Sequence, residues 1–170
     1  PLIEPITADN RVAGITSKLC ALLSAADILS AEGNPQPEPT RAFLELPRAD
    51  ALTLLYDSWL KSPAYSDLRL LPGLIFDGAW TDRPLQTRQA ILSLLHTLPV
   101  NTWWDLSALV AEVKLTAPDF LRSAGEYESW FIRRDVTDLY LSGYAHWNEI
   151  EGLWLRQFIT VTLHALGRTD

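Results

Sequence analysis

Proline placement limits what this 170-residue chain can fold into, because eleven prolines divide it into short segments. Proline lacks the backbone N–H that the interiors of helices and sheets require, so it is confined to element ends and loops. The segment 32–39 carries proline at positions 35, 37 and 39. This spacing predicts an exposed loop there.

Between these breaks, apolar residues recur at the spacing of amphipathic helices. Pro47 suits the first turn of one helix, and Asp105 suits the N-cap of another. Ile15, Leu19 and Cys20 lie in the apolar stripe of the first helix, so the Cys20 thiol is predicted to be buried. The predicted helices span 11–25, 47–61, 82–98, 105–115 and 147–166.

Short strands are expected between these helices. Residues 27–30 could form a strand, and residues 40–44 either a strand or the first turn of a short helix. A third strand is predicted near 102–104. The segment 129–142 has apolar flanks around the polar stretch 135–138, which is typical of a β-hairpin with its turn.

Helix, strand, helix and hairpin, the order predicted for residues 82–142, is the order of a winged-helix domain. The elements predicted for residues 11–44 match the last part of another such unit: its last helix, a strand, a loop and a second strand. The sequence therefore predicts a mainly α chain with short β-hairpins (α+β), winged-helix-like, in tandem or as one complete and one partial unit. Residues 1–75 would be a partial winged-helix-like region with a helical extension, and residues 76–170 a winged-helix-like domain with a long C-terminal helix. The absence of methionine suggests a piece of a longer chain.

Five strings resemble an uncharacterised family of larger bacterial proteins, some of which are labelled helicase-associated or DNA-binding. The resemblance covers about residues 50–167, and it implies winged-helix architecture within a larger chain. The strings are Leu55-Tyr-Asp-Ser-Trp-Leu-Lys-Ser-Pro, Leu70-Leu-Pro-Gly-Leu, Trp103-Trp-Asp-Leu, Gly125-Glu-Tyr-Glu-Ser-Trp-Phe-Ile-Arg and Tyr144-Ala-His-Trp-Asn-Glu-Ile-Glu-Gly.

The charge balance opposes strong DNA binding, because the net charge is −7 and acids exceed bases in both parts of the chain. Phosphate binding normally requires a face rich in lysine and arginine. The segment that precedes the hairpin, 118–128, would hold the recognition helix, yet it has more acidic than basic residues. Arg133 and Arg134 form the only adjacent basic pair, so any nucleic-acid contact is expected at this hairpin.

Eleven of the seventeen aromatic residues fall between positions 101 and 158. Interleaved with the arginine pair, they could form a platform on which bases stack. They could equally pack the hairpin onto the last helix or contact another protein. The candidate residues for nucleic-acid or partner contact are Arg133, Arg134, Trp130, Trp103 and Trp104.

No catalytic, cofactor-binding or metal site is predicted, so the chain is expected not to be an enzyme. His96, His146 and His164 lack ligand-like spacing, and the close carboxylate pairs fall in turns or at a helix start. No apolar stretch is long enough to span a membrane, and the single cysteine favours a cytoplasmic location.

The leading hypothesis is therefore a non-enzymatic winged-helix module of a larger bacterial protein, associated with nucleic acid. The alternative is a protein-interaction or structural module that does not bind nucleic acid. The expected partners are the remainder of a larger chain or another protein, with duplex DNA also possible. No membrane and no small-molecule substrate is expected.

Overall fold

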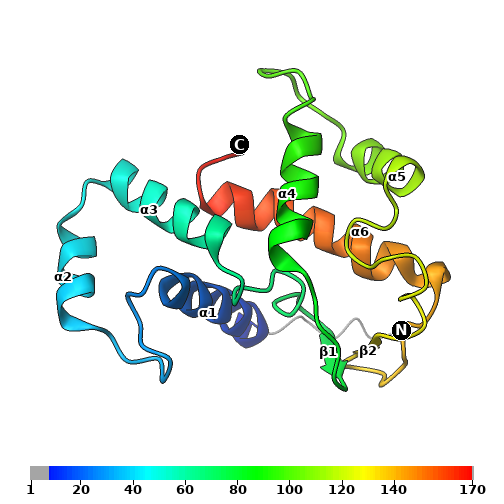
Figure 1. Ribbon diagram of the computed structural model, residues 1–170, viewed down its shortest axis with the longest axis horizontal. Coiled ribbons are helices and arrows are strands. Elements are labelled where there is room, and N and C mark those ends of the chain that lie inside the picture. Colours follow the sequence, from blue (N-terminus) through cyan, green and yellow to red (C-terminus); the bar gives the residue numbers. More distant parts are fainter. Residues whose placement is uncertain (1–7, 170) are drawn as a thin grey trace. The chain divides into compact units, whose positions relative to one another are not determined.

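Residues 8–169 are described in the computed structural model, with side chains from position 15 onward (Figure 1). Contacts divide the chain into two compact units, Pro1–Tyr65 and Ser66–Asp170, whereas the sequence placed a boundary at 75–76. The described part is mostly helical and contains a small two-stranded antiparallel sheet. The expectation of a mainly α, α+β chain is therefore confirmed.

The first unit contains three helices: α1 (Ala8–Ala25), α2 (Pro37–Glu45) and α3 (Arg48–Lys61). The helices predicted at 11–25 and 47–61 are present as α1 and α3, which contact each other. The strand proposed at 40–44 is wrong, because these residues lie inside α2 and match the helical alternative. The loop predicted at 32–39 is wrong at its end, because Pro37 and Pro39 lie within α2. Pro37 stands in the first turn, where the missing N–H costs no hydrogen bond.

Two further predictions for the first unit are also wrong. Residues 27–30 form a turn with one isolated bridge, Leu29 to Pro35, in place of a strand. Cys20 is exposed, and so are Ile15 (66%) and Leu19 (50%). Within this unit α1 packs against α3. Because one neighbouring helix covers only part of the surface of α1, some apolar residues of α1 stay exposed.

The first element of the second unit is a strand, where a loop was predicted. Its elements are β1 (Leu74–Asp77), α4 (Pro84–Leu95), α5 (Leu106–Thr116), β2 (Phe131–Arg134), a 3-10 turn η1 (Tyr144–His146), α6 (Trp147–Gln157) and a π-helical turn η2 (Phe158–Leu163). The helices predicted at 82–98, 105–115 and 147–166 are confirmed with small shifts at their ends. Asp105 caps α5 as expected, because its carboxylate accepts from the backbone N–H groups of Ser107 and Ala108.

The sheet differs from the predicted hairpin. Strand β2 pairs antiparallel with β1, with Leu74 opposite Arg134 and Asp77 opposite Phe131. The segment 139–141 turns back along the other side of β2, but it adds only an isolated bridge between Arg133 and Tyr140. The strand expected at 102–104 is wrong, because these residues lie in the loop between α4 and α5.

The core of the second unit is centred on α6, which packs against α5. Trp147, Ile150 and Trp154 of α6 are almost completely buried. A Cβ at Gly152 would make ordinary van der Waals contact with the Val110 side chain at 3.6 Å, so α6 lies close against α5 at this position. No described helix is long and apolar enough to cross a membrane.

Candidate functional site

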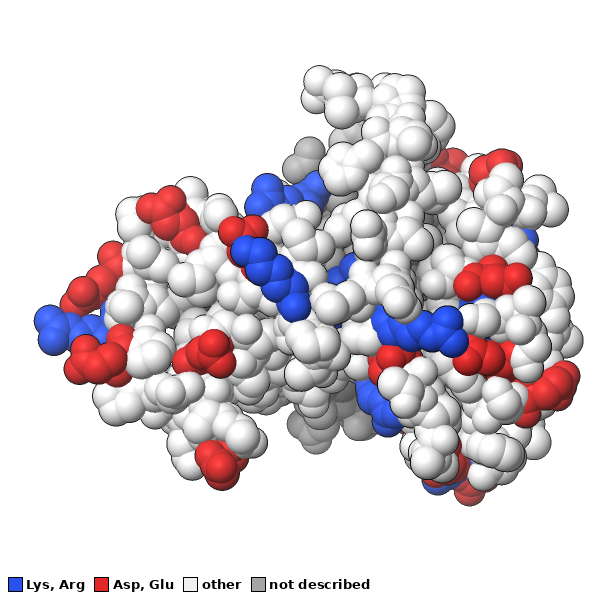
Figure 2. Space-filling view, in the orientation of Figure 1, with Lys and Arg blue, Asp and Glu red and all other residues white. Residues whose placement is uncertain are grey.

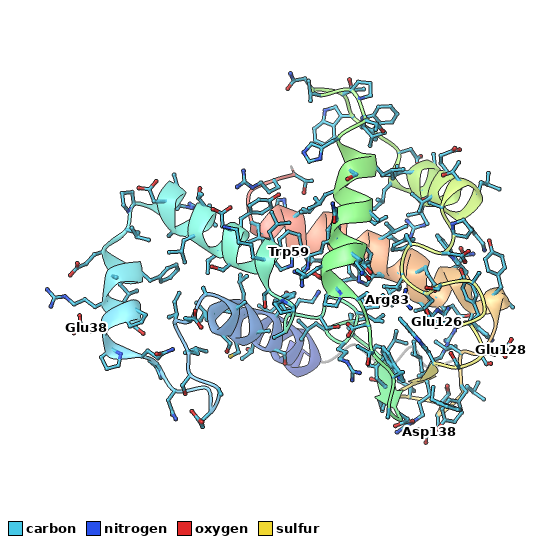
Figure 3. The ribbon with its side chains drawn as sticks, viewed as in Figure 1. Glu38, Trp59, Arg83, Glu126, Glu128 and Asp138 are labelled. Atoms are coloured by element: carbon cyan, nitrogen blue, oxygen red, sulfur yellow. The ribbon has the colours of Figure 1, made fainter. Side chains whose placement is uncertain are left out.

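The hairpin arginines lie on opposite faces of β2, because side chains alternate along a strand. The Nε of Arg133 donates to Asp77 Oδ2 at 2.7 Å, and its Nη1 pairs with Asp138, which is labelled beside the sheet in Figure 3. Arg134 pairs with Glu149 at the start of α6. Each arginine therefore has at least one carboxylate partner within its own unit.

The pKa shifts agree with these pairings. The hydrogen bond from Arg133 lowers the pKa of Asp77, and the same contact raises the pKa of Arg133. Hydrogen bonds from His146 and then Arg134 lower the pKa of Glu149. The carboxylates thus stay ionised at neutral pH, and they neutralise the positive charge that the hairpin would otherwise present.

Other arginines of the second unit are engaged in the same way. Arg83 reaches Glu126 at 2.9 Å, and Figure 3 shows these two labelled side chains close together. On the face drawn in Figure 2, lysine and arginine form small separate spots with acidic residues among them. This face has no continuous basic ridge of the kind that phosphate contacts require.

Two arginine–carboxylate pairs are buried, so another molecule cannot reach them. Arg88 Nε lies 2.9 Å from Asp67 Oδ2, and the Arg88 side chain is 0% exposed. Arg122 binds Glu151 through two bonds of 2.5 and 3.0 Å, with both side chains 0% exposed. Burial raises the pKa of Glu151, although the hydrogen bonds from Arg122 oppose this effect. These pairs link loops to helices α4 and α6.

The tryptophan candidates divide into one buried residue and two exposed ones. Trp130 is only 4% exposed and stacks on Trp80, with ring centroids 4.4 Å apart. Trp103 is 88% exposed and Trp104 47%, both in the loop that joins α4 to α5. Trp130 therefore belongs to the core, and the other two remain available to a partner.

We name residues 96–105 the tryptophan loop. Its Val100 is 84% exposed, and this residue was not among the predicted contacts. The Nε1 of Trp104 donates to the carbonyl of Pro99 at 3.4 Å, and the Asp105 cap follows directly. The loop is thus held at both ends by helices while its apolar side chains face water. In Figure 1 it projects from the second unit at the top of the view, and in Figure 2 the tip of this projection is white, without lysine, arginine, aspartate or glutamate.

A second group of exposed apolar residues surrounds the sheet. Phe131 (55%) and Tyr140 (53%) meet edge to face, with ring centroids 6.3 Å apart. Val136 (88%) and Leu139 (63%) occupy the turn and the returning segment. Basic contacts were predicted for this segment, whereas its exposed apolar residues were not. The signal in the sequence that could have indicated these exposed residues is the alternation of apolar residues with arginine and aspartate.

The histidines and the cysteine do not combine into a site. His96 bonds the Leu92 carbonyl, His146 bonds Glu149, and His164 bonds the Thr169 carbonyl. In the described part of the chain, no group of three His, Cys, Asp or Glu side chains could hold a metal ion. No protein-family model, curated protein or solved structure matches this chain.

Proposed function

We propose that this chain is a non-enzymatic winged-helix module that binds another protein through the tryptophan loop. The observation that carries the proposal is the exposure of Trp103 in a loop anchored between two helices. Tryptophan is enriched among the residues that dominate binding energy at protein interfaces. The partner would present an uncharged apolar pocket, because Val100, Trp103 and Trp104 offer no charge to pair.

The order of elements supports the winged-helix part of the proposal. The elements that correspond to the winged helix differ from those predicted from the sequence. Within the second unit, strand β1, helices α4 and α5, strand β2 and the returning segment 139–141 follow one another along the chain. In this order the helix before the wing is α5, and the irregular segment 118–128 is a connection.

The composition of α5 favours a protein partner over DNA. Its exposed positions include Ala108, Ala111, Glu112 and Leu115, none of which is basic. Its one basic residue, Lys114, places its ammonium 5.3 Å from the Trp147 ring and bonds Asn148. Phosphate contacts come chiefly from lysine and arginine, and none of the fully exposed residues of α5 is basic.

The test is affinity capture from cells that make the natural protein, with the wild-type chain and Trp103→Ala compared by mass spectrometry. Leu44→Ala is the matched control, because Leu44 is 75% exposed in the first unit, away from the tryptophan loop in the sequence. We expect a protein that both wild type and control recover and that Trp103→Ala loses.

Duplex DNA is assayed in parallel by fluorescence anisotropy at low salt. Salt-sensitive binding that is lost when Arg133 and Arg134 are changed to alanine would favour the DNA alternative. Equal recovery of all proteins by wild type and Trp103→Ala would contradict the tryptophan loop as the binding surface.

A further inference from the structure

An open groove of about 460 Å³ lies at the end of the sheet where β1 begins and β2 ends. Its walls come from the start of β1, the turn after β2 and the first turns of α6. Most of its surface is apolar, and the apolar lining residues are Pro72, Leu74, Val136, Leu141 and Leu153. A volume of this size accommodates a few side chains of a bound peptide.

The charged residues of the groove have an acidic excess. Arg134 and Glu149 pair with each other, so neither presents a free charge. Asp135 is exposed, and no hydrogen bond or ion pair of its carboxylate is found among the described residues. A cationic side chain that entered the groove would therefore find one unsatisfied carboxylate beside apolar walls.

The backbone of β1 offers a second means of recognition. Arg134 and Ile132 use their backbone groups toward the returning segment, as the bonds from Arg134 N to Leu139 O and from Leu141 N to Ile132 O show. In an antiparallel ladder, the backbone groups of successive residues point to opposite sides of the strand. The backbone N–H and C=O of Arg133 therefore point toward β1, where Ile75 is the opposite residue. The N–H and C=O of Leu74, the residue before Ile75, consequently point away from β2. Within the described residues these two groups have no hydrogen-bond partner. Peptides commonly bind by adding an extended strand to such an edge.

We propose that this groove binds an extended segment of a partner protein in which a lysine or arginine adjoins an aliphatic or aromatic residue. The cation pairs with Asp135, and the apolar side chain lies between Val136 and Leu153. The backbone of the segment bonds the free edge at Leu74. This surface is distinct from the tryptophan loop, so the inference goes beyond the proposed function and does not depend on it.

The test is selection of a phage-displayed library of random twelve-residue peptides against the full chain, with counter-selection against Asp135→Asn. We expect enriched peptides to carry a basic residue within two positions of a large apolar one. An enriched peptide, labelled with fluorescein, should bind Asp135→Asn roughly threefold to fivefold more weakly than wild type at low salt, because an exposed ion pair contributes little more than that.

Asp138→Asn is the matched control, because Asp138 lies in the same turn, already pairs with Arg133 and does not line the groove. It should leave the affinity of the peptide unchanged. The proposal is overturned if no peptide is enriched, if the enriched peptides lack basic residues, or if both aspartate variants weaken binding equally. Loss of binding in Trp103→Ala but not in Asp135→Asn would also overturn it, and would place the peptide on the tryptophan loop.

Discussion

The second unit contains two sets of arginine–carboxylate pairs that share their chemistry and differ in burial. Arg122 with Glu151 and Arg88 with Asp67 are shielded from water, since no side chain among them is more than 6% exposed. Around the sheet, Arg133 pairs with Asp138, of which 78% is exposed. One kind of contact therefore operates in two different dielectric surroundings.

The difference teaches which pairs hold the fold and which ones set the surface charge. An ion pair in water gains little, because solvent already stabilises both charges. A buried charge that loses its partner has no such compensation. We therefore expect the buried pairs to control stability, and the pairs of the sheet to control how much positive charge the surface shows.

The largest effect is expected for Glu151→Gln. This change leaves the Arg122 charge buried without a counterion, and it should lower the free energy of unfolding by about 3–5 kcal/mol. Urea denaturation followed by circular dichroism measures it. The control is Glu126→Gln, whose partner Arg83 is 50% exposed, with an expected loss of about 0–1 kcal/mol. Similar losses in both variants would remove the distinction by burial.

A slightly smaller effect is expected for Asp67→Asn. Arg88 would keep its buried position without its carboxylate, and about 3 kcal/mol should be lost. The double variant Arg88→Met with Asp67→Leu should recover much of that loss, because apolar residues of similar volume can replace a buried pair. If the double variant is no more stable than Asp67→Asn, then the geometry of the pair matters beyond its charge.

The pair of Arg134 with Glu149 should respond to acid and contribute little at any pH. Its carboxylate has a lowered pKa in the folded chain, so its contribution is fully present above pH 4.5, the unfolded value, and disappears as the pH falls through the folded value. We expect Arg134→Gln to lower the Tm by less than about 3 °C at pH 7. The difference from wild type should shrink as the pH falls below 4.5 and through the lowered pKa of Glu149. A difference that grows in acid would contradict the assigned partners.

The smallest effect on stability is expected for Trp103→Ser. Its ring is 88% exposed, so its removal creates no cavity and should change the free energy of unfolding by less than about 0.5 kcal/mol. Differential scanning calorimetry measures this change. Trp154→Phe in the core provides the contrast, because Trp154 is 2% exposed and stacks on Phe158. A large loss in Trp103→Ser would mean that the loop supports the fold.

The helices could be predicted because their signals are local. The 3.6-residue period, Pro84 at the start of α4 and the Asp105 cap are all visible within one segment of the sequence, whereas the prolines at the start of α2 predicted a loop. Strand β1 could not be found in this way, because its four residues become a strand only by pairing with β2, which lies more than fifty residues later. The sequence instead predicted the returning segment 139–141 as the partner of β2, because these two segments are adjacent in the sequence.

The candidate site was predicted in part. The tryptophan loop contains two of the five candidate residues. The sequence could not distinguish Trp130, which is buried in the core, from Trp103, which is exposed to water. The sequence shows the arginine pair as the basic feature of segment 129–142. It does not show that carboxylates neutralise this pair, because the contact of Arg133 with Asp77 spans 56 positions in the sequence.

The contrast between Trp103 and the buried tryptophans also gives the molecule an optical property. Trp59, Trp130, Trp147 and Trp154 are at most 4% exposed, so dissolved acrylamide should quench their fluorescence poorly. Trp103 stands in water and should be quenched readily. A partner that covers the tryptophan loop would remove that accessible fraction and shift its emission to shorter wavelength. The chain thus carries its own reporter of occupancy at the surface where we place its function.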